Sequence, residues 1–270
     1  MKILIVGGGN MGQSFAKSFV QNYITDVSNF AVLEKDKTKF DALKKIGINH
    51  IYETADERIS MADLVVLAVK PQAFQDLARQ IKSYISNEQV FLSIMAGVSI
   101  PSIQKALGID KVIRAMPNIA AQIGEGMSVF TSSDEVTRIE LVTVQNLLES
   151  TGKNLYVSNE DLIDAGTAVS GSGPAYVLYF MKAVMQAGRQ LGFTKKEAEM
   201  LTLQTFKGIV EYFQNSKDDC QGLIDKISSK GGTTEAAINY LISQKIDEHI
   251  QKAVLKAYDR AKELGRMSKE

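Results

Sequence analysis

The sequence has 270 residues, of which 45% are hydrophobic and 23% charged, as expected for a globular protein of one or two domains. Its 31 basic and 31 acidic residues cancel, which argues against a nucleic-acid-binding surface and against a polybasic membrane surface. No apolar run approaches the roughly 20 residues that a membrane-spanning helix needs.

The cysteine and histidine content bears on compartment and on metals. Cys220 is the single cysteine, so an internal disulfide is excluded and a reducing compartment is favoured. The chain opens on Met1 and Lys2 and then a strand, without the cleavage site of a secretory leader, so we expect a cytoplasmic protein. His50 and His249 stand far apart with no cysteine nearby, and we therefore expect no metal site.

The first stretch predicts a strand followed by a helix. Residues 2–6 form a short apolar, β-branched run, the pattern of a strand that is buried on both faces. After a glycine-rich turn, Phe15, Phe19 and Tyr23 recur every four residues, which indicates one face of a helix. A strand, a glycine turn and a helix in this order are typical of a dinucleotide-binding fold.

The turn between them contains the spacing G-x-G-x-x-G. Gly7 permits the tight turn, Gly9 lets the backbone approach a pyrophosphate, and Gly12 lets the helix pack close to the strand. The helix begins at Asn10 and Met11, and its first N–H groups can bind phosphate oxygens. The alternative is a glycine-rich turn in an α/β domain that binds no nucleotide.

A second predicted strand, residues 30–33, ends at an acidic residue, Glu34. It lies about 20 residues past the glycines, where an acid in this fold binds the adenosine ribose and favours NAD. Lys35, Lys37 and Lys39 follow, and their charge can neutralise the 2′-phosphate of NADP. A charged strand end that faces solvent is the alternative, and the choice between NADH and NADPH stays open.

The rest of the first half alternates strands and helices. We expect a helix around Ile103, another over residues 134–149, and strands at residues 62–69, 90–94, 111–115, 126–130 and 154–157. This alternation predicts the α/β class, with a Rossmann-like doubly wound sheet. Ligands bind such sheets at the carboxyl ends of the strands, so we expect residues 7–12, 68–71 and 116–118 to converge.

After about residue 158 the strand pattern stops, and the remainder is predicted to be all-helical. Residues 175–192 are apolar almost all round, which predicts a helix that is buried on most sides. Burying such a helix is hard for a domain this small to achieve alone, so a subunit interface is the expected partner. Thr194 and Glu197 have the spacing of a capping box that opens the next helix. We therefore expect a dinucleotide-binding domain over residues 1–158 and a helical substrate-binding and dimerisation domain over residues 159–270. Further helices are expected over residues 198–213, 234–243 and 248–265.

Two glycine-rich turns in the helical half are the candidate ligand sites. They are residues 170–174 and residues 228–235, and both open helices whose first N–H groups suit a carboxylate or a phosphate. Ser172, Thr233 and Thr234 add hydroxyl groups. Capping alone accounts for one hydroxyl per helix, but paired glycines weaken a helix unless the backbone must approach a ligand.

The two turns also limit the chemistry. Neither contains histidine or cysteine, and Lys230 is their sole candidate acid or base. A lysine on a loop is more often solvated than catalytic. A reductase without a strong acid needs a substrate that is already electrophilic, and a protonated imine meets that requirement.

Residues 164–176, which contain the run Ser-Gly-Ser-Gly-Pro at 170–174, resemble the signature of pyrroline-5-carboxylate reductases. The likeness covers essentially the whole chain, through residues 7–12, 68–71, 93, 96–97, 114–118, 204–205 and 231–234. It implies reduction of 1-pyrroline-5-carboxylate to L-proline with NADH or NADPH, the last step of proline biosynthesis. It also implies an interlocked helical homodimer, often assembled into a decamer.

The resemblance also implies roles for individual residues. It places the substrate carboxylate on the backbone N–H groups of Gly231, Gly232 and Thr233. It places the ring nitrogen at the hydroxyl of Thr234, the candidate catalytic residue, and Thr167 beside the carboxamide of the cofactor. The pocket next to the nicotinamide would be shaped by Ser170, Gly171, Ser172 and Gly173. The dinucleotide cleft would be lined by Ala68, Val69, Lys70, Pro71 and Asn118.

The chain departs from the family pattern at several positions. Lys230 stands where the family usually has proline, which is expected to loosen the glycine turn while adding attraction for an anion. Ile119–Ala120 replace Thr-Pro, Lys182 replaces a common glutamate, and Asp219–Cys220 replace His-Pro. Because Thr234 and the glycines are kept, we expect activity with altered kinetics.

Two other functions fit parts of the sequence. A dehydrogenase of 3-hydroxy acids would use the same cofactor fold, but it needs a helical lysine for proton transfer, and no convincing candidate faces the predicted pocket. A dinucleotide-binding sensor without catalysis would use its helical half for assembly only. The intact Gly-Gly-Thr-Thr turn argues against the sensor.

Overall fold

The computed structural model describes residues 1–22 and 26–267. Tyr23, the last residue of the aromatic pattern predicted for the first helix, lies outside them. The strands are β1 (Ile3–Val6), β2 (Phe30–Leu33), β3 (His50–Tyr52), β4 (Leu64–Leu67), β5 (Val90–Ser93), β6 (Val112–Met116), β7 (Gly126–Ser132) and β8 (Gly152–Tyr156). The α-helices are α1 (Asn10–Gln21), α2 (Phe40–Lys45), α3 (Phe74–Ile81), α4 (Ile100–Leu107), α5 (Arg138–Glu149), α6 (Asp161–Gly166), α7 (Gly173–Gln190), α8 (Lys195–Gln214), α9 (Cys220–Ile227), α10 (Thr233–Ser243) and α11 (Ile246–Met267). A π-helix covers Thr167–Gly171, between α6 and α7.

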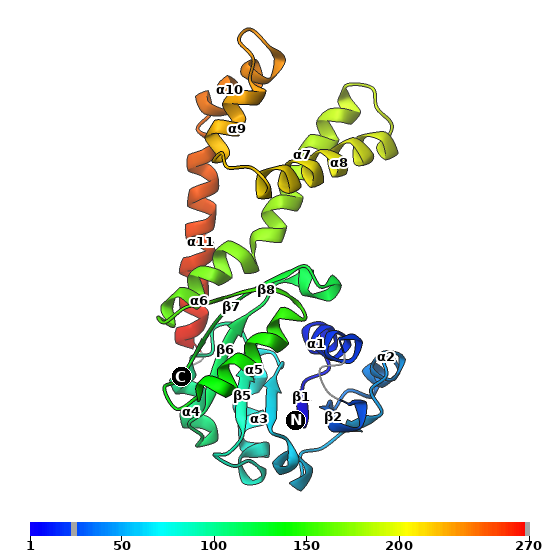
Figure 1. Cartoon of the computed structure of the whole chain (residues 1–270), viewed down its shortest axis with the longest axis vertical. Helices are drawn as coiled ribbons and strands as arrows, with labels where there is room; N and C mark the ends of the chain where they lie inside the picture. Colours follow the sequence, from blue (N-terminus) through cyan, green and yellow to red (C-terminus); the bar gives the residue numbers. More distant parts are fainter. Residues whose placement is uncertain (23–25, 268–270) are drawn as a thin grey trace. The chain divides into compact units, whose positions relative to one another are not determined.

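Within the described residues, the strands form one sheet in the order β3-β2-β1-β4-β5-β6-β7-β8 (Figure 1). Neighbouring strands run parallel except at β6 and β7, which are antiparallel. The order reverses beside β1, so the crevice for a ligand lies at the carboxyl ends of β1 and β4. The predicted doubly wound sheet is confirmed.

Alternate residues of each strand pack into cores on opposite faces of the sheet. Ile3 and Ile5 of β1 pack with Phe15 and Phe19 of α1 and with α5. The intervening residues of β1 pack with α3 and α4 on the other face. This two-faced burial explains why the sequence shows continuous apolar runs rather than alternation.

The chain divides into two compact units that do not coincide with the expected domains. One unit holds residues 1–172 and 257–270, and the other holds residues 173–256. In the first unit, the end of α11 packs closely on the turn after β5, since a Cβ on Gly97 would lie 3.1 Å from the backbone nitrogen of Gly265. A glycine at each of these positions allows that approach.

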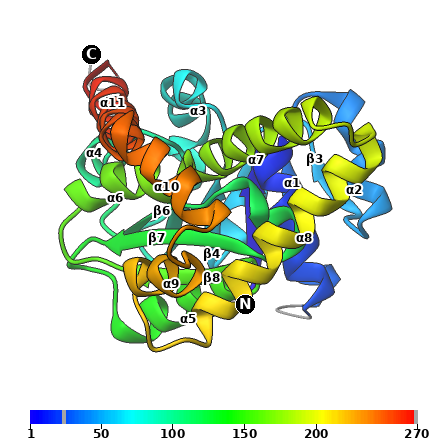
Figure 2. The ribbon, with the colours of Figure 1, turned by 90° about the horizontal axis from the view of Figure 1, so that it is seen from above.

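The second unit is helical, and its first two helices form an antiparallel hairpin (Figure 2). Gly192 lies between them with φ of +105°, and Thr194 and Glu197 make the predicted capping box at the start of α8. The predicted burial of the first of these helices is not met within one chain. Leu178 is 63% exposed and Tyr179 is 74% exposed. Among the described residues no helix is long and apolar enough to cross a membrane.

Candidate active site

The glycine turn after β1 has the shape of a phosphate cradle. A Cβ on Gly12 would lie 2.0 Å from the carbonyl oxygen of Gly7, so only glycine allows α1 to start this close to the strand. Gly7 has φ of +107°, and its own Cβ would lie 2.8 Å from the carbonyl oxygen of Ala68. Around Gly9, in contrast, no described atom outside Gly9 and its two chain neighbours lies within 4 Å of an added Cβ. The turn is therefore closed toward the protein and open on the side where a diphosphate would bind.

The first turn of α1 suits an anion. Gly9 is its N-cap residue and provides no side-chain acceptor, and the turn has no acidic residue. The first N–H groups of the helix, which begin at Asn10 and Met11, therefore lie at the positive end of the helix dipole, and no described side chain caps them. Together with the open cradle, this arrangement fits the diphosphate of a dinucleotide.

Glu34, directly after β2, is turned inward rather than toward solvent. Its side chain is 6% exposed, and one carboxylate oxygen accepts from the backbone N–H of Gly8 at 2.8 Å and from Nζ of Lys39 at 2.9 Å. The other oxygen accepts from the N–H of Asp36 at 2.8 Å. The alternative of a solvent-facing strand end is wrong, because these three donors hold the carboxylate beside the glycine turn.

Lys39 balances this buried carboxylate. Burial acts to lower the pKa of Lys39, but its hydrogen bond and attraction to Glu34 outweigh burial and raise the pKa. Lys37 instead pairs with Glu53 at 3.1 Å on the exposed surface, and Lys35 is exposed. At the predicted ribose position, the negative charge of Glu34 is therefore neutralised by one lysine, Lys39.

The loops expected to converge do meet: residues 68–71 border the glycine turn, and the short helix after Asn118, Ile119–Ile123, contacts α1. Ala68 donates its N–H to Val6 at 2.9 Å, and its carbonyl lies against Gly7, so residues 68–71 border the glycine turn. Val69 lies 3.1 Å from the position of a Cβ on Gly7. Lys70 is exposed, and Pro71 opens a short 3₁₀ turn before α3.

Asn118, in the third loop, holds backbone groups. Its Nδ2 donates to the carbonyl oxygen of Ser170 at 3.0 Å, and its Oδ1 accepts from the N–H groups of Ala120 and Met127. The structure thus joins Asn118 to residues 170–174, the serine-glycine turn. The sequence analysis missed this link. The contact of Asn118 with a cofactor stays a prediction.

The serine-glycine turn lies in and just after the π-helix. Ser172 donates its N–H to the carbonyl of Thr167 at 2.8 Å, the wider bond of a π-turn. The hydroxyl of Thr167 donates to Ile163 at 2.8 Å, and that of Ser170 donates to Gly166 at 2.9 Å. Because these hydroxyl hydrogens are engaged, Thr167 presents lone pairs, which suits acceptance of a hydrogen bond from the amide of a carboxamide.

The second glycine turn precedes α10 in the helical unit. Gly231 has φ of +72° and donates its N–H to the carboxylate of Glu235 at 2.8 Å. Gly232 donates its N–H to the carbonyl of Ser229 at 2.9 Å and, as N-cap residue, provides no side chain. Two of the N–H groups predicted to hold a carboxylate therefore have partners within the chain. Sequence reasoning missed Glu235 here, although its place three residues after the N-cap is the acidic position of a capping box.

The hydroxyl-bearing residues of this turn are on the first turn of α10. Thr234 is half-buried and Thr233 is exposed, as are Lys230 and Gly231. Gly173, the last residue of the first predicted pocket, opens α7. Gly171 lies on Met116, since a Cβ there would be 3.3 Å from the methyl carbon of that side chain.

Comparison with known proteins identifies the family. A family model described as pyrroline-5-carboxylate reductase dimerisation matches residues 160–264, and one described as NADP oxidoreductase, coenzyme F420-dependent, matches residues 2–97. Pyrroline-5-carboxylate reductase of Aquifex aeolicus (strain VF5) is 35% identical over 268 residues, which are 98% of this chain and 97% of the relative.

Solved structures agree with this comparison. A pyrroline-5-carboxylate reductase from Coxiella burnetii has a TM-score of 0.88 at 35% identity, covering 97% of this chain and 98% of that one. The pyrroline carboxylate reductase of Plasmodium falciparum, with NADP bound, has a TM-score of 0.87 at 28% identity and covers 98% of each chain. The chain belongs to the pyrroline-5-carboxylate reductase family.

Proposed function

We propose that this chain reduces the C=N bond of 1-pyrroline-5-carboxylate to give L-proline, with NADPH or NADH as the reductant. The observation that carries the proposal is the 35% identity to a pyrroline-5-carboxylate reductase over 98% of the chain. The cradle at the start of the sheet supports the dinucleotide, because it is open around Gly9, where a diphosphate would approach. Proline biosynthesis is the corresponding role.

The cofactor end of the site uses backbone more than side chains. The turn of Gly7, Gly9 and Gly12 and the N–H groups from Asn10 and Met11 bind the diphosphate. Glu34 and Lys39 face the adenosine ribose, and residues 68–71 form the adjacent wall. The bound cofactor supplies the hydride for the imine carbon.

The substrate end uses the helical glycine turns. We assign the substrate carboxylate to the N–H groups at Gly231, Gly232 and Thr233, and the ring nitrogen to the hydroxyl of Thr234. The carboxylate of Glu235 accepts the N–H of Gly231, and the carbonyl of Ser229 accepts that of Gly232, so the substrate carboxylate replaces both acceptors when it binds. Ser170, Gly171, Ser172 and Gly173 shape the pocket, and Thr167 accepts a hydrogen bond from the carboxamide.

The chemistry needs positioning rather than a strong acid. In the protonated imine the nitrogen already carries its proton, so the C=N electron pair moves onto nitrogen as the carbon receives hydride. A residue that holds the ring against the cofactor accelerates this step by orientation. Thr234 serves as the hydrogen-bond partner of the ring nitrogen, and no proton from Lys230 is required.

Assembly and location complete the proposal. The match of residues 160–264 to a reductase dimerisation model supports a homodimer through the helical region, which the family resemblance extends to a decamer. We keep the functional division into residues 1–158 for the dinucleotide and residues 159–270 for substrate and dimerisation. A cytoplasmic location agrees with a single free cysteine, Cys220.

Initial rates with purified protein test the function. NADPH and NADH oxidation are followed with 1-pyrroline-5-carboxylate, and NAD⁺ reduction is followed with 3-hydroxy acids as the control reaction. Turnover of the imine alone supports the proposal. Turnover of the 3-hydroxy acid alone overturns it, and silence from folded protein that binds NADH favours the sensor.

A further inference from the structure

One side of β6 and the loop after it hold the whole segment from residue 160 to residue 171. Arg114, Met116 and Asn118 follow one another at spacing two, the repeat that brings side chains to one face of a strand. Arg114 binds the start of the segment, while Met116 and Asn118 contact its end. The segment contains α6 and the π-helix Thr167–Gly171.

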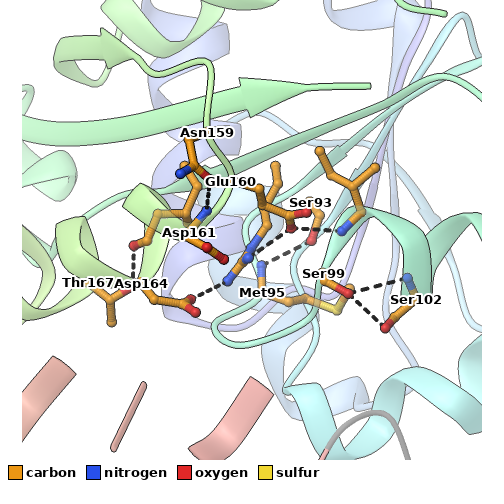
Figure 3. Close-up of polar contacts among 12 residues, drawn as sticks. Ser93, Met95, Ser99, Ser102, Asn159, Glu160, Asp161, Asp164 and Thr167 are labelled. Carbon is orange, nitrogen blue, oxygen red and sulfur yellow. Dashed lines mark hydrogen bonds and ion pairs between the residues drawn. The ribbon is translucent and has the colours of Figure 1, made fainter. Parts of the chain in front are cut away.

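Arg114 makes the contact at the start. Its side chain is 4% exposed; Nη1 donates to Glu160 at 2.9 Å and Nη2 donates to Asp164 at 2.7 Å. Figure 3 shows Glu160 and Asp164 directed toward the same group from successive turns. The same oxygen of Glu160 also accepts the N–H of Ile100, the first residue of α4, at 2.8 Å. The buried guanidinium thus joins β6 to the start of α6, and the carboxylate of Glu160 joins both to α4.

The far end of the segment is held without charge. Asn118 donates to the carbonyl oxygen of Ser170 at 3.0 Å, and Met116 packs on Gly171. In the middle, a Cβ on Gly166 would lie 2.7 Å from Cγ2 of Val129 in β7, so α6 lies directly on the sheet. The π-helix is therefore enclosed between two anchored ends.

Within the described part of the chain, the contacts of Arg114 leave one of its buried donors without a partner, which lowers stability and is not needed for packing. Nε of Arg114 is buried and has no hydrogen-bond partner among the described residues. A buried donor without a partner opposes stability, and it persists where the surrounding structure imposes the geometry. Short π-helical turns are also less favourable than a regular helix and are frequent at functional sites. Both features lie around the turn that the proposed function assigns to the substrate pocket.

We infer that Arg114 is a positioning residue for the reaction: by binding Glu160 and Asp164 together, it sets the π-helix that carries Thr167 and Ser170. This inference rests on the proposed function, which places those residues at the pocket. A lysine cannot replace the arginine fully, because one ammonium lacks the planar fork that binds two carboxylates at fixed angles. Arg114 touches no reacting atom and acts through the segment.

The control is an ion pair at the residue just before the same strand. Lys111, just before β6, pairs with Glu140 of α5 at 2.9 Å and has no contact with residues 160–171 among the described interactions. Lys111→Met therefore removes a cross-element ion pair of β6 without touching the π-helix. Arg114→Lys, Asp164→Asn and the double variant are the test proteins, with Arg114→Met as the stronger change.

Steady-state kinetics and hydrogen exchange are measured on each full-length protein. We expect Arg114→Lys and Asp164→Asn each to lower kcat roughly 10- to 100-fold, because small misplacements of positioning groups have effects of this size. The dissociation constant of NADH changes less than twofold. The double variant loses no more activity than the more impaired single variant, since both substitutions act through one contact. Lys111→Met keeps kcat and the exchange protection of residues 163–172.

Hydrogen exchange separates this inference from the proposed function. If wild-type protein reduces no imine, the function fails, yet faster exchange of residues 163–172 in Asp164→Asn still supports the structural part of the inference, that the Arg114 ion pairs set the π-helix. Wild-type kcat and wild-type protection in both single variants overturn the inference. Equal losses in Lys111→Met overturn it too, because they would mean a general loss of stability. If Arg114→Met does not fold, the two milder variants decide.

Discussion

At the scale of single residues, Glu34 is the residue on which we expect the choice of cofactor to depend. Its carboxylate is held beside the glycine turn by Gly8 and is neutralised by Lys39. A negative charge at this position opposes the 2′-phosphate of NADPH, whereas Lys39 attracts it. Glu34 binds the glycine turn directly, whereas Lys39 binds Glu34, so the carboxylate lies nearer to the turn than the ammonium group. We therefore expect NADH to be preferred.

Glu34→Gln tests this preference. The amide oxygen can still accept the N–H of Gly8, but the charge is lost and Lys39 becomes available to a phosphate. We expect the ratio of dissociation constants, NADPH over NADH, to fall about tenfold, which corresponds to about 1.4 kcal/mol. Nicotinamide fluorescence titration measures both constants. Glu53→Gln, which frees Lys37 on the exposed surface, is the matched control, and the same shift in that variant would contradict the assignment.

Thr234 is the residue on which the substrate assignment depends most directly. Thr234→Ala removes one hydroxyl at the start of α10, and we expect kcat to fall about tenfold, the effect of one lost hydrogen bond. The dissociation constant of NADH should stay at the wild-type value. Ser243→Ala, at the other end of the same helix, should leave both unchanged. Loss of NADH binding in Thr234→Ala would contradict the assignment.

At the scale of elements, α5 is stabilised by an ion pair whose strength depends on pH. Burial raises the pKa of Glu140, but the Lys111 ammonium and the N–H and hydroxyl of Thr137 outweigh it and hold the pKa below its usual value. A carboxyl with a lowered pKa adds stability above its unfolded-state pKa, and this stability is lost as pH falls through the folded-state pKa.

Glu140→Gln should therefore destabilise the protein in a pH-dependent way. At neutral pH we expect a decrease of about 0.5–1 kcal/mol in the free energy of unfolding, the size typical of a partly exposed ion pair. The difference from wild type should shrink as the pH falls below the usual carboxyl pKa of about 4.5. Urea unfolding at a series of pH values measures it. A constant difference across the series would show that the charge of Glu140 contributes nothing.

The elements also show where sequence patterns are sufficient. Buried strands such as β1 and β4 and the capping box at Thr194 were predicted correctly, because each depends on residues adjacent in sequence. β3 was missed, since His50 is exposed, the other two residues are only partly buried, and the three leave no apolar run. α6 and the π-helix were missed too, because contacts with β6 and β7 select them rather than local propensity.

At the scale of the whole molecule, the helical unit leaves a large apolar surface uncovered within one chain. Among the described residues, α7 and α8 expose Val177, Leu178, Tyr179, Val184, Met200, Leu201, Leu203 and Val210. Soluble monomers rarely expose so many large apolar side chains on two adjacent helices. The match to a reductase dimerisation model agrees with a second copy of the chain as the cover.

Tyr179→Glu tests this assembly. A buried, unpaired carboxylate is costly, so we expect the assembly to dissociate to monomers at micromolar concentration and the thermal midpoint to fall. Sedimentation velocity measures the mass. Gln75→Glu places the same charge on an exposed position of α3 and should leave the assembly intact. An unchanged mass for Tyr179→Glu would place the subunit interface elsewhere.

The sequence alone determined the doubly wound sheet, the glycine turn at Gly7–Gly12 and the family, because these depend on apolar periodicity and on short runs of adjacent residues. It did not determine the hydrogen bond from Gly8 to Glu34, the contact of Asn118 with Ser170, or the pairing of Arg114 with Glu160 and Asp164. Each of these joins residues that lie far apart along the chain. Such partners are selected only when the tertiary structure assembles. A charge or amide that becomes buried then loses its water, and this cost must be offset by the group that packs beside it.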